Sequence, residues 1–137
     1  MSTSLLASSI MISPAPMIKA NAALGEVVDT LIKHQLTGLP VVDDQNTVIG
    51  FVSEQDCIHA MLVSSYHCEG SPTVSDVMHN EVLSVSPDRS IVDIAQTMGK
   101  NRPKSYPVIE DGVLLGLLTR GAILTALWES RASCDAP

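Results

Sequence analysis

The side chains best suited to hold a polar ligand are Ser53 and Asp56, which lie three positions apart where an apolar run gives way to a helical pattern. A carboxylate offers two acceptor oxygens, and hydrogen bonds to a charged group are the stronger kind. The start of a helix adds free backbone N–H groups that attract anions. The same Ser-x-x-Asp spacing is that of a capping box, whose role is to begin the helix. Both interpretations stay open, since one residue can serve both purposes.

The elements that must position these residues occur twice in the chain. A shift of 67 residues places Met11 on Met78 and the run 40–44 on 107–111. One residue is then dropped in a turn, and a shift of 66 places 50–53 on 116–119. Each copy is read as strand, helix, strand, strand, helix. One copy is too small to bury its apolar face well, so we expect the two to pack as one module. The expected bounds are 7–63 for the first copy, 64–73 for the linker, 74–128 for the second copy and 129–137 for a flexible tail.

Helical periodicity marks the first helix of each copy. Apolar residues recur at helical spacing over 24–32 and again over 91–98. Asn21 and Asp88 are the expected N-caps of these helices. Leu31 on the first stripe is expected in the core.

Two apolar runs joined by a polar turn predict a β-hairpin in each copy. In the first copy the runs are 39–42 and 48–52, and Val41 is expected to be buried. In the second copy they are 108–109 and 113–118. A closing helix follows each hairpin. Its apolar residues are Ile58, Met61 and Leu62 in the first copy, and Ile123, Leu124, Leu127 and Trp128 in the second.

Composition excludes several classes of function. The chain has 137 residues, a formal net charge of -7 and 3% aromatic residues, so it is poorly suited to bind nucleic acid. Its three cysteines have irregular spacing, which argues against a disulfide framework or structural zinc and for a reduced, cytoplasmic location. Residues 1–18 lack a basic start and an unbroken apolar run, so neither a signal peptide nor a membrane span is expected.

With these features the sequence resembles a tandem pair of cystathionine-β-synthase (CBS) domains, the Bateman module, over about residues 7–128. The resemblance rests on Met11 and Met78, the runs 38–43 and 50–56, and the weaker second copies of both runs. It implies an α/β (α+β) fold of two βαββα motifs with pseudo-twofold symmetry. It also implies clefts that bind AMP, ADP, ATP or S-adenosylmethionine, a homodimer, and regulation of a separate target protein. No catalysis, required cofactor, metal, nucleic acid or membrane is expected.

The resemblance assigns roles to the Ser-x-x-Asp residues. Asp56 accepts hydrogen bonds from the ribose hydroxyls, and Ser53 helps to hold ribose or phosphate. The second copy has Thr119 and Arg120, but Ala122 replaces the acid, so its cleft is expected to be empty, weak or different in ligand. Arg120 could meet an anion, although a solvated surface arginine is the favoured interpretation.

Other positions border the nucleotide in the family. They are Thr37, Gly38 and Leu39 before one strand, Lys104, Ser105 and Tyr106 before its counterpart, and Met78, Val82 and Leu83 beside the adenine. Lys104 is the best phosphate partner, with an exposed loop lysine as the alternative. The adenine-lining residues could equally be ordinary core. Residues 15–17 are the matching segment of the second cleft, where Pro16 removes a backbone N–H.

Three functions compete for this sequence. The favoured one is an adenine-nucleotide sensor that signals to a partner, supported by Ser53 and Asp56. The alternative is a scaffold dimer without ligand, supported by Ala122. An enzyme has little support, because no P-loop, HExxH or GxSxG motif is present. The cysteine and histidine residues at 57, 59, 67 and 68 match no standard metal-site spacing.

Overall fold

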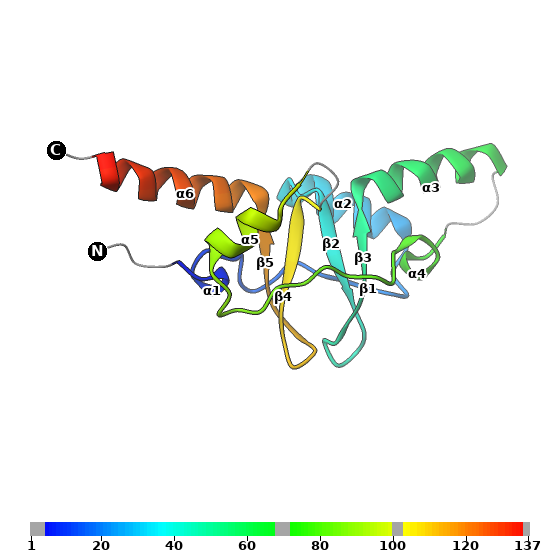
Figure 1. Ribbon diagram of the computed structural model, residues 1–137. Coiled ribbons are helices and arrows are strands. Elements are labelled where there is room, and N and C mark those ends of the chain that lie inside the picture. Colours follow the sequence, from blue (N-terminus) through cyan, green and yellow to red (C-terminus); the bar gives the residue numbers. More distant parts are fainter. Residues whose placement is uncertain (1–4, 68–71, 100–102, 136–137) are drawn as a thin grey trace. The chain divides into compact units, whose positions relative to one another are not determined.

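A computed structural model of the protein describes residues 5–67, 72–99 and 103–135 (Figure 1). The chain divides into two compact units. The contiguous unit is Pro16–Val82, and the split unit joins Met1–Ala15 to Leu83–Pro137. The contiguous unit holds β1 (Ile18–Lys19), α2 (Leu24–His34), β2 (Gly38–Val42), β3 (Val48–Ser53), α3 (Glu54–His67) and α4 (Val74–Val77). The split unit holds α1 (Ala7–Ile10), α5 (Ile91–Thr97), β4 (Ser105–Glu110), β5 (Val113–Thr119) and α6 (Arg120–Asp135).

The predicted hairpin of the first copy is confirmed as β2 and β3, which pair antiparallel. The short strand β1 adds to the other edge of β2 in parallel, with Ile18 opposite Val41. Between β2 and β3, Asp43 Oδ1 accepts hydrogen bonds from the backbone N–H groups of Gln45 (2.9 Å) and Thr47 (3.0 Å). A carboxylate that binds the backbone two residues on stabilises a turn, which explains why the chain reverses at this point.

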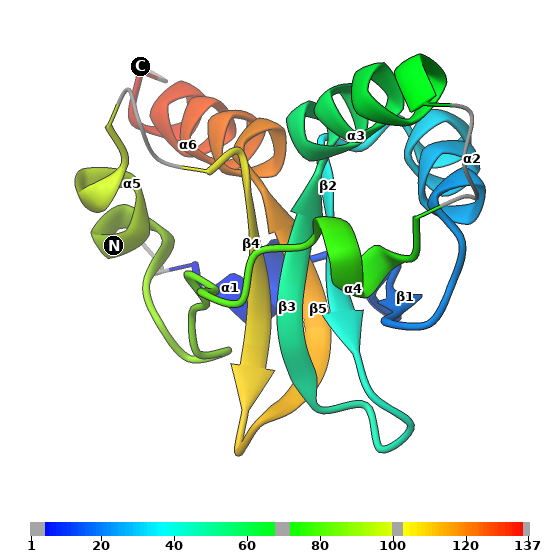
Figure 2. The ribbon, with the colours of Figure 1, turned by 90° about the vertical axis from the view of Figure 1, so that its right-hand side faces the viewer.

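Helix α2 follows the predicted stripe in part and begins later than expected. Leu24 and Leu31 are buried, as is Val41 on β2, so the predicted core positions are confirmed. Ile32 belongs to the same stripe but is 71% exposed. Within the contiguous unit α2 lies beside α3 (Figure 2).

Both predicted N-caps are wrong by two residues. Helix α2 has Ala23 as its N-cap, without a side-chain hydrogen bond. Helix α5 has Ser90, whose Oγ accepts a hydrogen bond from Val92 N (3.2 Å). Asn21 and Asp88 therefore lie in the preceding turns, which is the other position that these side chains favour.

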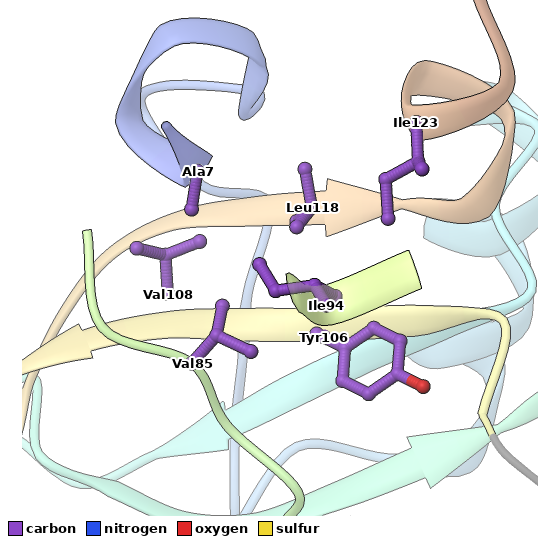
Figure 3. Packing of buried hydrophobic residues seen from close by; sticks show 7 residues of the cluster. All are labelled: Ala7, Val85, Ile94, Tyr106, Val108, Leu118 and Ile123. Atoms are coloured by element: carbon purple, nitrogen blue, oxygen red, sulfur yellow. The ribbon is translucent and has the colours of Figure 1, made fainter. Parts of the chain in front are cut away.

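The split unit repeats the same arrangement. Strands β4 and β5 pair antiparallel, confirming the second hairpin, and Val85 makes a parallel bridge to Val108 where β1 would pair. The buried cluster of this unit draws on every element around the hairpin (Figure 3). Its members are Ala7, Val85, Ile94, Tyr106, Val108, Leu118 and Ile123. The α/β fold with two βαββα-like copies is thus confirmed.

The short segment that leads into each copy pairs with the hairpin of the other copy. In the contiguous unit, His79 and Phe51 exchange two backbone hydrogen bonds of 2.8 and 2.9 Å. In the split unit, Ile12 and Leu117 exchange two of 2.8 and 3.0 Å. Because each hairpin has one edge covered by residues from the opposite copy, the compact units do not coincide with the sequence repeats.

The closing helices are longer than the sequence predicted. Helix α3 continues to His67, through the first four residues of the expected linker, and α6 continues to Asp135, into the segment expected as a tail. Both helices carry exposed apolar side chains. These are Ile58, Met61, Leu62 and Val63 on α3, and Leu124, Leu127 and Trp128 on α6. Within the described parts of the chain, none of the helices has the length and hydrophobicity that crossing a membrane requires.

Candidate ligand-binding site

Ser53 and Asp56 form a complete capping box at the point where β3 passes into α3. Asp56 N donates to Ser53 Oγ (3.1 Å), and Asp56 Oδ2 accepts from Ser53 N (2.9 Å) and from Ser53 Oγ (2.8 Å). These bonds satisfy backbone donors that a helix start otherwise leaves unpaired. The predicted capping box is therefore present. Asp56 Oδ1 takes no part in it.

Two of the predicted neighbours, Thr37 and Gly38, lie beside this pair, and the others are placed as follows. Gly38 lies opposite Ser53 in the β2–β3 register, and the carbonyl of Thr37 accepts from Glu54 N (2.9 Å). Leu39 is fully buried in the core, so only its backbone is available to a ligand. Met78 packs its thioether against Gly50 on β3, close to the same strand end. Val82 is half-buried, at the end of the contiguous unit.

A groove of about 520 Å³ opens beside Asp56 within the contiguous unit. Helices α3 and α4 supply most of its lining, with Gln55, Asp56, His59, Ala60, Val63, Pro72, Asp76 and Val77. Its charged lining residues are acidic. A second groove of about 420 Å³ runs between α2 and α3 and is lined mainly by apolar residues, including Ile32, Ile58 and Met61.

His79 is the residue that sequence reasoning missed. Its Nε2 lies 2.7 Å from Asp56 Oδ1, the oxygen outside the capping box. The His79 side chain is 63% exposed and that of Asp56 is 15% exposed. The signal that could have found it is the repeat itself, because His79 follows Met78 and matches Ile12, which follows Met11.

The positions in the split unit that match Thr37 and the Ser53–Asp56 turn make the same hydrogen bonds to the backbone but carry different side chains. Thr119 Oγ1 accepts from Ala122 N (3.1 Å), as Ser53 does from Asp56 N. Arg120 N donates to the carbonyl of Lys104 (2.9 Å), as Glu54 N does to Thr37. The acidic group of the first copy is thus replaced by Ala122, and two basic residues take the places of Thr37 and Glu54.

The remaining predicted residues of the split unit are placed as follows. Ser105 and Tyr106 are buried, and Tyr106 belongs to the core cluster (Figure 3). Leu83 is exposed, as are the side chains of Lys104 and Arg120. The alternative of ordinary core, which the sequence left open for the adenine-lining residues, therefore does not fit Leu83.

Cys57, directly after Asp56, is buried and free. Burial raises the pKa of its thiol, and the neighbouring Asp56 carboxylate raises it further. A thiol with a raised pKa stays protonated at neutral pH and is a poor nucleophile or metal ligand. Among the residues that the structure places, no three His, Cys, Asp or Glu side chains gather as a metal site would require, and Cys68 lies outside those residues.

The fold is thus a tandem repeat of two βαββα-like copies with exchanged lead-in segments, and comparison with known proteins shows its family. The CBS domain model matches residues 7–63 and 74–129, so the chain belongs to the CBS domain family.

Relatives support this placement over different lengths. Protein MJ1225 of Methanocaldococcus jannaschii is 29% identical over 102 residues, which cover 74% of this chain and 35% of that protein. The chain thus spans about a third of that relative.

Two solved structures are similar over nearly the whole chain. The crystal structure of CBSX2, a protein of Arabidopsis thaliana, in complex with AMP has a TM-score of 0.79 and 26% identity, covering 92% of this chain and 98% of that one. The CBS domain pair of protein MJ0100 in complex with 5′-methylthioadenosine and S-adenosyl-L-methionine has a TM-score of 0.80 and 22% identity, covering 94% and 99%. At that identity the second likeness shows the fold alone.

Proposed function

We propose that the protein is a regulatory module that binds an adenosine-containing ligand, AMP, ADP, ATP or S-adenosylmethionine, and signals to a separate partner protein. The observation that carries the proposal is the Asp56 carboxylate at the start of α3, with one oxygen outside the capping box and a groove beside it. The crystallised CBSX2 chain, which this chain matches nearly throughout, is in complex with AMP.

The proposed chemistry is recognition without reaction. The ribose hydroxyls donate to Asp56, and a charge-assisted bond of this kind contributes about 1.5–3 kcal/mol. Ser53 and the backbone of 37–39 border the ribose, and Met78, Val82 and Leu83 flank the adenine. In the split unit Lys104, Ser105, Tyr106, Thr119 and Arg120 are the corresponding proposed ligand residues, with Lys104 and Arg120 as the groups for a phosphate.

A regulatory role is proposed in preference to an enzymatic one. Cys57, the free thiol next to Asp56, is buried and its pKa is raised, so it does not act as a nucleophile at neutral pH. A homodimer is proposed as the signalling form, because the exposed apolar side chains of α3 and α6 form surfaces that a second copy can cover.

The second candidate function is a scaffold dimer that binds no ligand. It is favoured by Ala122, which removes the carboxylate from one copy, and by the capping box, which gives Asp56 a purely structural role.

Thermal unfolding in the presence of AMP, ADP, ATP, S-adenosylmethionine and NAD separates the two. A ligand at 100 times its Kd stabilises the folded protein by about 2.7 kcal/mol. We expect at least one of the adenosine ligands to raise the midpoint in a concentration-dependent way, with guanosine monophosphate as the control. If none does, the scaffold function replaces the sensor.

A further inference from the structure

The two oxygens of the Asp56 carboxylate have different partners in the free protein. Oδ2 accepts two hydrogen bonds, from Ser53 N (2.9 Å) and Ser53 Oγ (2.8 Å). Oδ1 lies 2.7 Å from His79 Nε2. Each carboxylate oxygen has about two lone-pair positions, so Oδ2 is saturated by the helix cap and Oδ1 has one position left.

A ribose diol presents two hydroxyl donors to this carboxylate. Because Oδ2 is saturated, both hydroxyls can bind only at Oδ1, and only after the His79 imidazole has left it. Opening the capping box would be the alternative, and it would leave the Ser53 N–H at the helix start without its partner, whereas moving His79 breaks no backbone contact.

His79 is built to move in this way. Its backbone is fixed to β3 through two hydrogen bonds with Phe51, while its side chain is 63% exposed. A rotation about the side-chain torsions therefore releases Asp56 and leaves the sheet unchanged. Rotamer changes of exposed side chains take picoseconds to nanoseconds, so the exchange imposes no slow step.

The internal repeat supplies a control within the same chain. Ile12 occupies the place of His79, with the same pair of backbone hydrogen bonds, in this case to Leu117. Ala122 occupies the place of Asp56, with the same backbone bond to the preceding hydroxyl. The second copy therefore lacks both side chains of the His79–Asp56 contact and keeps the backbone that carries them. The His79–Asp56 contact is therefore present in the first copy and absent as a whole from the second.

We infer that His79 is a latch on the Asp56 carboxylate: it occupies Oδ1 in the free protein, the ribose must displace it, and its protonation weakens ligand binding. This inference rests on the proposed function and adds the regulation of that site. Imidazole is the side chain whose charge ordinarily changes between about pH 5 and pH 8. The protonated ring adds the attraction of a full positive charge to its bond with the carboxylate, so it holds Asp56 more strongly than the neutral ring does. Affinity for the ligand therefore falls as the pH falls.

Other titratable groups lie on the elements near His79. Helix α3 carries Glu54, Cys57, His59, Tyr66 and His67 besides Asp56, and α4 carries Asp76, whose Oδ2 accepts from Thr73 N (3.0 Å). The segment of His79 itself carries Glu81, and β3 carries none. His34, which is exposed near the end of α2 and lines neither groove, is the matched histidine control.

The test is calorimetric titration of the full chain with adenosine, which carries no titrating phosphate, at several pH values from 5.5 to 8. AMP is titrated in parallel. For the wild type we expect the Kd for adenosine to rise about tenfold between pH 8 and pH 5.5, the factor that corresponds to about 1.4 kcal/mol. His79→Ala and His79→Gln should bind more tightly at pH 5.5 and show a flat profile. His34→Ala should keep the profile of the wild type.

The outcomes separate this inference from the proposed function. Adenosine binding by His79→Ala with the affinity and pH profile of the wild type, or weaker binding at every pH, overturns the latch and leaves the ligand site standing. Adenosine binding by His79→Ala together with no binding by the wild type supports the latch. Failure of adenosine, AMP, ADP, ATP and S-adenosylmethionine to bind any variant at any pH overturns the proposed function, and the latch with it. Thermal unfolding of each variant verifies that it is folded.

Discussion

The thioether of Met78 occupies the space that a side chain on Gly50 would need. A Cβ placed on Gly50 would lie 2.6 Å from Met78 Sδ and 2.8 Å from the carbonyl oxygen of His79. The second copy repeats this relationship between Gly116 and Met11. The glycine in each hairpin thus allows the lead-in segment of the opposite copy to lie flat against the strand.

Gly50→Ala should therefore destabilise the protein. Overpacking a close contact typically costs about 1–3 kcal/mol, and the obstructing atoms at this position include backbone, which cannot move aside easily. Chemical denaturation measures the change in the free energy of unfolding. Gly25→Ala is the control, because a Cβ on Gly25 meets nothing within 4 Å and alanine favours the helix. Equal midpoints for the two variants would show that the lead-in packing is not tight.

Leu31→Ala should cost about 2–5 kcal/mol, because it removes a buried side chain from α2 and leaves a cavity. Ile32→Ala, at the next position and 71% exposed, should change stability by less than about 0.5 kcal/mol. The two variants are compared by urea unfolding. A larger loss for Ile32→Ala would mean that this exposed side chain is covered in solution.

Asp56→Ala should have two separable effects. Loss of the capping box should lower stability by about 0.5–2 kcal/mol, and loss of the carboxylate should abolish binding of the adenosine ligand. Asp56→Asn keeps an acceptor for Ser53 N and should recover most of the stability without recovering binding. Ser90→Ala removes a cap of similar type from α5 and should reduce stability alone. Normal ligand binding by both Asp56 variants would assign this residue to the cap only.

The two copies should differ in affinity, because Asp56 and Ala122 occupy matched positions. One hydrogen bond to a charged group, about 1.5–3 kcal/mol, corresponds to roughly a tenfold to hundredfold difference in Kd. Calorimetry should find about one tight site per chain. Ala122→Asp should add a second binding event, whereas Gly121→Asp, which places the same charge one residue earlier, should not. Two equal sites in the wild type would contradict this asymmetry.

Light scattering at high protein concentration should give the mass of a homodimer. Leu62→Glu or Leu124→Glu should shift it toward the monomer, because these side chains are 65% and 70% exposed on α3 and α6. Val92→Glu, on an exposed apolar position of α5, is the control and should leave the mass unchanged. A monomeric wild type would refute the dimer.

Local patterns in the sequence predicted the local structure. The two hairpins follow from apolar runs separated by polar turns, and the burial of Leu31 follows from helical spacing. Ile32 satisfies the same spacing and is exposed, because periodicity identifies a stripe and not which of its edges meets the core. The N-caps were predicted two residues too early, because Asn and Asp side chains such as Asn21 favour a turn as much as a helix start.

The exchanged segments and His79 could not be predicted in the same way. The pairing of Ile12 with Leu117 joins residues that are far apart in sequence, and no propensity specifies it. His79 is a single histidine that belongs to no motif. Its contact with Asp56 exists only because the lead-in segment of the second copy pairs with the hairpin of the first. Alignment of the two copies could reveal only that His79 and Ile12 occupy matched positions and differ in chemistry.

The exchange of lead-in segments also sets an order for folding during synthesis. The contiguous unit is complete once residue 82 has left the ribosome, and its contacts are comparatively local. Residues 5–15 must wait for β5, with a whole unit intervening, before Ile12 can pair with Leu117. Closing a loop of that size costs chain entropy and slows folding. We therefore expect the nascent chain to hold a folded contiguous unit while residues 5–15 are still unpaired, and a ribosome stalled before β5 to expose these residues to proteases and chaperones.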